Sequence, residues 1–297
     1  MMKKVISMML MAAMSVSVLA GCTGGSTTPA TTEAPATETT AAETKAPVRT
    51  EELVLKSGEK NVVGTMFLPP EEKETYPTVV MSHGFNSNSF LLEGYAESFA
   101  KEGYACYAYD FCGGSPSTKS DGDTKEMSVL TEAQNLSDVI DQLKELDYVD
   151  ESHLFLFGLS QGAFVSSYVA AQRPDDVKAL VLFYPAFSLQ EDCWNRHGSI
   201  ENVPDEETVM GVPLSGLYSK DAMSFDIYEV IGNYKGDVLI CHGDKDTLVD
   251  ISYSEKAVEV YENAELKVIQ YGEHGFQGKT EKEATAATLE FLNAHKG

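Results

Sequence analysis

The sequence is poor in basic residues, and this shortage argues against two kinds of partner. Its 297 residues include 22 Lys and Arg against 46 Asp and Glu, which gives a formal net charge of −24. A surface with this excess of negative charge repels phosphate groups. We therefore expect no nucleic-acid partner and no electrostatic adhesion to anionic lipid.

Cysteine is also scarce, and its spacing fits no metal-binding motif. Five cysteines are present. Cys106 and Cys241 lie in apolar runs typical of strands, which favours buried free thiols. Cys112 and Cys193 lie outside such runs, and a disulfide between Cys106 and Cys112 remains an alternative. Because no His, Asp, Glu and Cys cluster has the spacing of a metal site, we expect no metal ion and no other cofactor.

The apolar run from Val5 to Val18 is shorter than the span of about 20 residues that a transmembrane helix needs. It follows Lys3 and Lys4 and precedes Leu19-Ala20-Gly21-Cys22. A basic start, a short apolar core and small residues before a cleavage point are typical of a secretory signal. The last four residues resemble the signal of bacterial lipoproteins, so we predict a signal peptide over residues 1–21. A plain signal peptide and a membrane helix are the alternatives.

The lipoprotein resemblance implies cleavage before Cys22 and lipidation of its thiol. We therefore expect an exported protein that a lipid holds on the outward face of the bacterial cell membrane. Residues 23–47 are rich in Thr, Ala and Pro and contain no aromatic or large aliphatic residue. Such a segment buries too little apolar area to offset the entropy of ordering it. We predict a disordered tether over residues 22–48.

Residues 49–297 are numerous enough for one α/β domain. Short apolar runs alternate with segments of helical periodicity, after an expected antiparallel hairpin over residues 52–68. The alternation stops at residues 186–230, which are rich in Pro, Gly and acidic residues, and resumes at Asp237. This pattern predicts an α/β fold with a mostly parallel central sheet, helices on both faces and an insertion at about 186–230.

The most informative motif is Gly158-Leu159-Ser160-Gln161-Gly162, which follows an apolar run and precedes a helix-compatible segment. This is the form of a nucleophile elbow, a tight strand-to-helix turn that exposes a serine. The two glycines stand where a side chain would collide with neighbouring backbone. Ser160 then lies at a helix N-terminus, where backbone N–H groups favour negative charge.

A serine nucleophile needs a base and an acid that orients the base, and suitable residues follow in a known order. An acidic turn with Asp244 and Asp246 follows one strand-like run, and His274 follows the next. In α/β hydrolases the order is serine, acid, histidine. Because parallel strands end at the same edge of a sheet, we expect these side chains to meet there.

With these residues placed, the chain from about Glu51 onward resembles the bacterial cinnamoyl and feruloyl esterases of the α/β-hydrolase superfamily. The motifs that carry this resemblance are His83-Gly84-Phe85, Tyr109-Asp110-Phe111, Met127-Ser128-Val129-Leu130-Thr131-Glu132, Ser160-Gln161-Gly162, Pro185-Ala186, Ile227-Tyr228-Glu229-Val230, residues 242–249 and His274-Gly275-Phe276. The resemblance implies an α/β-hydrolase fold that carries a lid over the active site.

The same resemblance assigns roles to five residues. Ser160 is the nucleophile, Asp246 the triad acid and His274 the base. The family places its acid three residues after the Gly of His-Gly, which selects Asp246 over Asp244. The backbone N–H groups of Phe85 and Gln161 form the oxyanion hole. The implied activity is hydrolysis of a small-molecule carboxylic ester through an acyl-enzyme.

The insertion at 186–230 is expected to act as the lid and to set the specificity, with Asp192 and Trp194 contacting the substrate. Asp192 stands where the family places an acid that binds the phenolic hydroxyl of a hydroxycinnamate. Alternatively, the insertion is purely structural and has no role in substrate binding. For the whole protein the alternatives are a serine aminopeptidase, an acylglycerol lipase and a non-catalytic surface-binding lipoprotein.

Five other histidines have no expected role in catalysis. We expect His83 to shape the oxyanion loop and His242 to be a hydrogen-bonded core residue at the end of a strand. His153, His197 and His295 lack a companion motif and are expected to be solvated.

Overall fold

The fold is taken from a computed structural model that describes residues 46–296. The expected signal peptide at 1–21, the expected lipid on Cys22 and nearly all of the expected tether lie outside these residues. Within the described part, the helices are all too short or too polar to cross a membrane.

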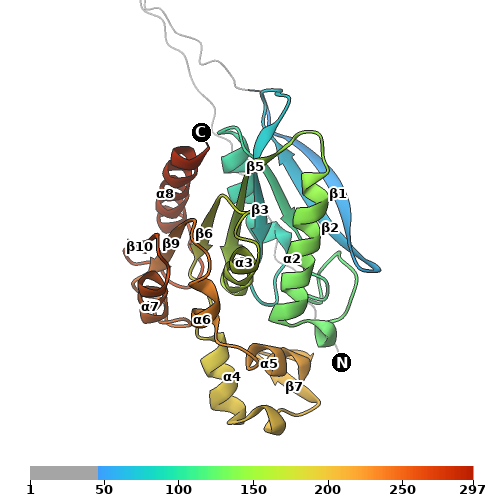
Figure 1. The fold of residues 1–297 in the computed structure, drawn as a ribbon, viewed down its shortest axis with the longest axis vertical. Coiled ribbons are helices and arrows are strands. Elements are labelled where there is room, and N and C mark those ends of the chain that lie inside the picture. The colour runs from blue at the N-terminus through green and yellow to red at the C-terminus, as the bar shows by residue number, and fades with distance from the viewer. Residues whose placement is uncertain (1–45, 297) are drawn as a thin grey trace, which may run out of the picture. The chain divides into compact units, whose positions relative to one another are not determined.

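Eight strands form one central sheet in the order β1-β2-β4-β3-β5-β6-β9-β10 (Figure 1). Their bounds are β1 Arg49–Ser57, β2 Lys60–Leu68, β3 Tyr76–Ser82, β4 Ala105–Tyr109, β5 Val149–Leu159, β6 Ala179–Phe183, β9 Asp237–Gly243 and β10 Ala264–Ile269. The first two strands form the expected antiparallel hairpin, and β2 pairs antiparallel with β4. All later pairings are parallel.

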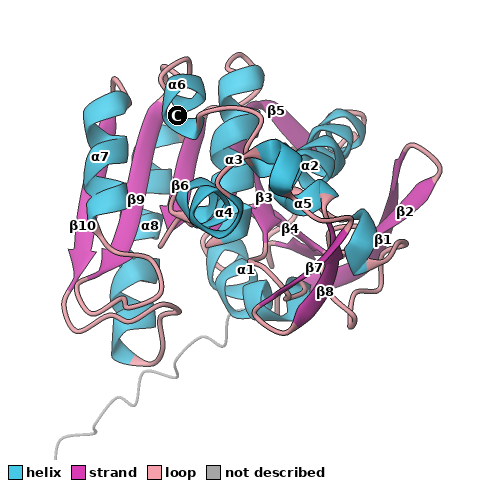
Figure 2. Cartoon of the chain, turned by 90° about the horizontal axis from the view of Figure 1, so that it is seen from below, coloured by secondary structure: helices cyan, strands magenta, loops and turns pink. Residues whose placement is uncertain are grey.

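Helices cover both faces of the sheet, with α2, α3 and α7 on one side and α1 and α8 on the other (Figure 2). Their bounds are α1 Glu93–Ala100, α2 Val129–Lys144, α3 Gln161–Gln172, α7 Ser252–Val260 and α8 Lys279–His295, with 3₁₀ turns η1 Ser89–Leu92 and η2 Thr124–Glu126. This arrangement confirms the predicted fold class, a mostly parallel sheet between two helical layers.

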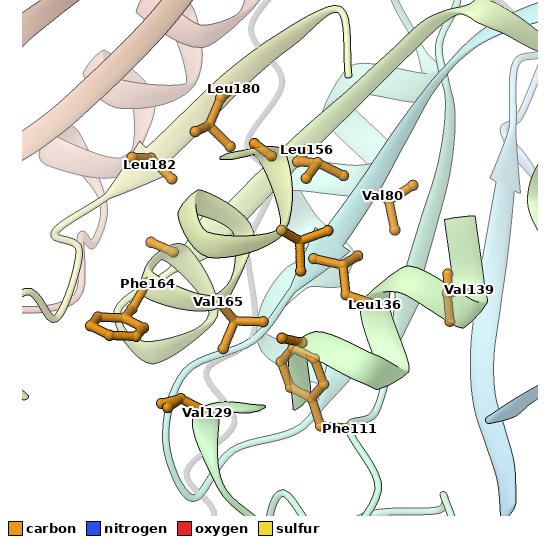
Figure 3. Close-up of a cluster of buried hydrophobic side chains, with 14 of the residues drawn as sticks. Val80, Phe111, Val129, Leu136, Val139, Leu156, Phe164, Val165, Leu180 and Leu182 are labelled. Atoms are coloured by element: carbon orange, nitrogen blue, oxygen red, sulfur yellow. The ribbon is translucent and has the colours of Figure 1, made fainter. Parts of the chain in front are cut away.

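The apolar runs are continuous rather than alternating because both faces of each central strand are buried. In β5, Leu154 and Leu156 face the α2 and α3 side, whereas Phe155 and Phe157 face the α1 and α8 side. Figure 3 labels Leu156 among the side chains of the first of these clusters, together with Leu136 of α2. Burying each such side chain contributes roughly 1.5–3 kcal/mol, so the strand that carries the elbow is firmly held.

Between β6 and β9 the chain leaves the sheet and forms a small group of elements beyond one end of it (Figure 1). These are α4 Leu189–His197, η3 Ile200–Asn202, β7 Glu206–Val209, β8 Val212–Ser215, α5 Leu217–Ala222 and α6 Ile227–Ile231. We call this segment, residues 186–230, the insertion. It is bound to the segment before α2: the Ser128 hydroxyl, at the N-cap of α2, donates to Asp221, and the Thr124 hydroxyl, in η2, donates to the Pro213 carbonyl.

Candidate active site

Ser160 lies in a strained turn between β5 and α3. Its φ is 51° and its ψ is −115°, a conformation that costs a non-glycine residue about 1–3 kcal/mol. The turn is tight because a Cβ on Gly158 would lie 2.5 Å from the Gly162 carbonyl oxygen. A Cβ on Gly162 would lie 2.3 Å from the carbonyl oxygen of His83. Both glycines are therefore required by close backbone contact, as the motif predicts.

The structure brings Ser160, His274 and Asp246 into one hydrogen-bonded line. The Nε2 atom of His274 lies 2.9 Å from Ser160 Oγ, and its Nδ1 atom lies 2.8 Å from Asp246 Oδ2. A carboxylate only accepts hydrogen bonds, so Nδ1 carries the ring proton and Nε2 is left to accept the proton of the serine hydroxyl. The ring of Tyr184 packs against the imidazole, with centroids 4.8 Å apart, and helps to hold its orientation.

Asp246 is kept ionised by its donors. Burial alone would raise the pKa of this carboxyl, but hydrogen bonds from His242, His274 and the Val249 N–H together hold it well below its usual range. Its Oδ1 atom accepts the backbone N–H groups of Leu248 and Val249, each at 2.9 Å. The side chain is 0% exposed. The carboxylate is thus fixed by the turn that follows β9.

The competing acid, Asp244, has a different place. Its Oδ1 atom accepts the backbone N–H of Tyr271, and its Oδ2 atom lies 3.2 Å from the Lys245 ammonium. These contacts tie the turn after β9 to the turn after β10. Asp246, and not Asp244, contacts His274.

The two backbone N–H groups expected to form the oxyanion hole, those of Phe85 and Gln161, donate to no backbone acceptor within residues 46–296. The loop that carries Phe85 lies against the nucleophile, since a Cβ on Gly84 would lie 3.2 Å from Ser160 Cβ. His83 shapes this loop: its Nε2 accepts the Phe111 N–H at 3.0 Å, and its Nδ1 donates to the Gly84 carbonyl. Burial lowers the pKa of His83, which favours this neutral form.

The side chain of Gln161 is held at both ends of its amide. Its Nε2 donates to Glu132 Oε2 at 2.8 Å, and its Oε1 accepts the Tyr218 hydroxyl at 2.8 Å. The Tyr218 ring also packs against Phe85, with centroids 5.7 Å apart. One tyrosine of the insertion therefore contacts both residues whose N–H groups flank Ser160. Glu132 lies in one of the motifs that carry the family resemblance, but no role was assigned to it, and the sequence offered no signal for Tyr218.

A cavity of about 700 Å³ opens onto Ser160 and His274. Its walls are mainly apolar and come from the loop after β3, the end of β5, the insertion and the turn after β9. The apolar and aromatic residues among them are Phe85, Leu91, Leu159, Tyr184, Ala186, Leu189, Val209, Met210, Tyr218, Leu248 and Val249. Such a cavity suits a small, largely apolar molecule that places one polar bond at the serine.

Helix α4 supplies three polar residues to the cavity wall. Asp192, Asn195 and Arg196 lie on one face of this helix and line the cavity. Asp192 accepts a hydrogen bond from the Ser188 hydroxyl at 3.1 Å. Trp194 is not among the lining residues, and it is 44% exposed. Of the two insertion residues singled out from the sequence, only Asp192 is placed to touch a molecule in this cavity.

The remaining histidines and cysteines fill structural positions, with one correction. His242 is buried as expected, but its Nε2 atom also lies 3.2 Å from Asp246 Oδ2, a contact that the sequence did not indicate. The expectation that His197 is solvated is wrong, because its side chain is 10% exposed and pairs with Glu207. In the described part of the chain the four cysteines are buried and free, so Cys106 and Cys112 form no disulfide.

No group of three or more His, Cys, Asp or Glu residues within 46–296 is arranged to hold a metal ion. The described site offers a serine with a hydrogen-bonded base, an acid that contacts this base and two backbone N–H donors. This set is suited to acyl transfer.

The chain is similar to one protein family and to several solved structures. The family model described as serine aminopeptidase S33 matches residues 73–210, a stretch that includes Ser160 but ends before Asp246 and His274. A structure of Est1E from Butyrivibrio proteoclasticus with bound ferulic acid is 27% identical, covers 82% of this chain and 98% of that one, and has a TM-score of 0.75. A complex of DcsB with its substrate analogue is 20% identical, covers 83% and 99% of the two chains, and has a TM-score of 0.69.

A curated relative, the uncharacterized protein YcjY of Escherichia coli, is 30% identical over 111 residues. The match covers 36% of this chain and about a third, 35%, of that protein.

Fold and comparisons together define the protein as an α/β hydrolase. Within that class it resembles the feruloyl esterases, as its motifs indicate, and Est1E is a structurally similar protein.

The buried carboxyl of Glu132 makes a pH-dependent contribution to stability that can be measured. Burial raises its pKa to about 8, against a partly opposing hydrogen bond from Gln161. A carboxyl whose pKa is raised by folding stabilises the fold fully below the unfolded pKa, and this contribution is lost as the pH rises through the folded value.

We expect the free energy of unfolding of Glu132→Gln to increase relative to that of wild type as the pH is raised from about 5 to 8. The change is on the order of 3–5 kcal/mol at about 1.36 kcal/mol per pKa unit. Urea unfolding at a series of pH values across this range measures the change. Glu145→Gln is the control for removal of a charge, because Glu145 is an exposed residue at the C-terminal end of α2. A constant difference between Glu132→Gln and wild type at all pH values would contradict the prediction.

Proposed function

We propose that the protein is a serine hydrolase that cleaves carboxylic esters through an acyl-enzyme, with Ser160 as nucleophile, His274 as base and Asp246 as triad acid. The observation that carries the proposal is the hydrogen-bonded line from Ser160 Oγ through His274 to Asp246. Its support is threefold: the strained turn exposes the serine, the cavity opens onto it, and two free N–H groups lie beside it.

The proposed reaction uses each group in turn. Nε2 of His274 takes the hydroxyl proton while Ser160 Oγ attacks the ester carbonyl, and Asp246 stabilises the imidazolium. The N–H groups of Phe85 and Gln161 hold the oxyanion, where each donor is worth about 3–4 kcal/mol. His274 returns the proton to the leaving alcohol. It then takes a proton from water, which attacks the acyl-enzyme, and the proton finally returns to Ser160.

Removal of the nucleophile is the first test. Ser160→Ala is expected to lower turnover of p-nitrophenyl acetate by about a millionfold, because the covalent route is lost. A fluorophosphonate probe should label the wild type and leave the variant unlabelled, while circular dichroism shows both folded. Near-normal hydrolysis by folded Ser160→Ala would end the proposal and favour a non-catalytic lipoprotein.

The two neighbouring acids provide a matched pair. Asp246→Asn is expected to lower kcat by about ten thousandfold, since an amide at this position favours the wrong imidazole tautomer. Asp244→Asn removes a charge two residues away and should lower kcat by less than about tenfold. Asp244 accepts the backbone N–H of Tyr271 and does not contact His274. If the effects were the reverse, Asp244 would be the acid that orients His274.

For the substrate we propose a hydroxycinnamoyl ester whose phenolic hydroxyl donates to Asp192. Three observations support this choice: Asp192 lines the cavity, the rest of the wall is mainly apolar, and the similar Est1E structure holds ferulic acid. A site arranged to pair a hydroxyl discriminates against an analogue that lacks it, because its own polar group is left unpaired.

The substrate proposal predicts that methyl p-coumarate is cleaved about tenfold faster than methyl cinnamate, the gain of one hydrogen bond to a charged acceptor. Asp192→Ala should remove this preference and leave p-nitrophenyl acetate hydrolysis unchanged. Glu191→Ala is the matched control, since Glu191 is an acid on the same helix that bonds Tyr253 instead of lining the cavity. Equal rates on both methyl esters in the wild type would favour a general carboxylesterase.

A serine aminopeptidase is the second candidate, favoured by the family model that matches residues 73–210. Asp192 could then pair with a substrate ammonium group. Parallel assays with aminoacyl p-nitroanilides and with the aryl esters separate the two activities. A lipid anchor on Cys22 and a lid role for the insertion remain proposals alongside either one.

A further inference from the structure

A second histidine contacts the acid of the proposed triad. His242 is the penultimate residue of β9 and is 0% exposed, and its Nε2 atom lies 3.2 Å from Asp246 Oδ2. The same carboxylate oxygen accepts the hydrogen bond of His274 Nδ1. Asp246 is therefore bracketed by two imidazoles, one facing the nucleophile and one facing the interior of the domain.

The surroundings of His242 define its tautomer. Its Nε2 atom also lies 3.0 Å from the Val249 carbonyl oxygen, so both neighbours of this nitrogen are acceptors. Nε2 must then carry the ring proton, and in the neutral ring Nδ1 is an acceptor. Nδ1 lies 2.7 Å from the hydroxyl oxygen of Ser254, a residue of α7 that is also 0% exposed. The Ser254 hydroxyl donates to Nδ1 and fixes the tautomer.

We propose that His242 is a positioning residue for Asp246 and that Ser254 holds His242 in the tautomer this role needs. In this arrangement Ser254 is hydrogen-bonded to His242, whose Nε2 lies 3.2 Å from Asp246 Oδ2 beside its hydrogen bond to the Val249 carbonyl. Asp246 is in turn hydrogen-bonded to His274, and His274 to Ser160. This inference rests on the proposed serine-hydrolase function. The N–H of His242 stabilises the carboxylate and restricts Oδ2 to the side that faces His274.

A purely structural role would leave different contacts. A core histidine that only satisfies its own hydrogen bonds needs no ionised neighbour, and the Val249 carbonyl would suffice for Nε2. Here the N–H also lies beside an ionised oxygen in a site with no exposed surface, where charge–dipole interactions are stronger than in water. Removing it leaves Oδ2 with His274 as its single imidazole donor.

Two amide substitutions separate the roles. The amide nitrogen of Gln occupies the place of Nε2, whereas that of Asn occupies the place of Nδ1. His242→Gln is expected to keep kcat/KM within a few-fold of wild type. His242→Asn should lose about 10- to 100-fold, the usual effect of losing a hydrogen bond to a buried charge. The loss should fall on kcat, because the substrate does not touch His242.

The pH dependence of kcat/KM provides a measurement that would not change if His242 only packed in the core. Without the His242 donor, Asp246 holds the proton of His274 more tightly. The acidic limb of kcat/KM should therefore shift upward by about half a pH unit to one unit in His242→Asn and stay in place in His242→Gln. Ser254→Ala should shift it in the same direction by less. Ser166→Ala is the control, since Ser166 Oγ is buried and has no hydrogen-bond partner among the described residues.

The outcomes distinguish this inference from the function it rests on. A wild type that hydrolyses no ester and takes no fluorophosphonate label overturns both. An active wild type whose His242→Asn variant keeps its rate and its acidic limb overturns the positioning role alone. Equal losses in the Gln and Asn variants with an unmoved limb would reduce His242 to core packing. If His242→Asn does not fold, the acidic limb of the kcat/KM profile of Ser254→Ala is the test. A limb at the same pH as that of Ser166→Ala would reject the proposal.

Discussion

The close approach of backbone at Gly158, Gly162 and the end of β3 is the constraint on which the site depends. A Cβ on either glycine would meet backbone atoms at 2.5 Å or less, so no side chain fits. This contact presses the loop after β3, which carries Phe85, against the start of α3, which carries Gln161. The strain of the turn is resisted by backbone bonds, because the Ser160 N–H donates to the Phe183 carbonyl and its carbonyl accepts the Ala186 N–H. The buried strands β5 and β6 thus hold the serine in place.

Two buried carboxyls show how the surroundings set a protonation state. Asp246 and Glu132 are both shielded from water, yet burial prevails only in Glu132. Asp246 accepts two backbone N–H groups and contacts two imidazoles, which outweighs the loss of hydration. Glu132 accepts a single amide N–H from Gln161 and has no cation beside it. The first carboxyl is suited to hold a charged imidazolium, and the second to hold a side chain in place as a neutral acid.

The insertion lines the cavity and also contacts the loop that carries Phe85. Helix α4 presents Asp192 to the cavity, and Tyr218 of α5 contacts Gln161 and Phe85. The insertion is fastened to the start of α2 by hydrogen bonds such as the one from Ser128 to Asp221. A change of sequence in this segment can therefore alter the shape of the cavity and the geometry beside Ser160 together.

Local sequence was sufficient to predict the strands, the mostly parallel sheet and the nucleophile elbow. These features depend on hydrophobic periodicity and on glycine spacing, which are set by a few neighbouring residues. The order of Ser160, the acidic turn and His274 also indicated which segments meet. Choosing Asp246 over Asp244 required the family resemblance, since both follow the same strand and a turn decides which one faces the histidine. The contacts of His242, Glu132 and Tyr218 were decided by tertiary structure alone. These residues belong to β9, α2 and the insertion, and their partners lie far along the chain or across a turn whose path no local pattern encodes. A buried polar side chain takes its role from the partner that folding brings to it, and that partner is absent from its own segment.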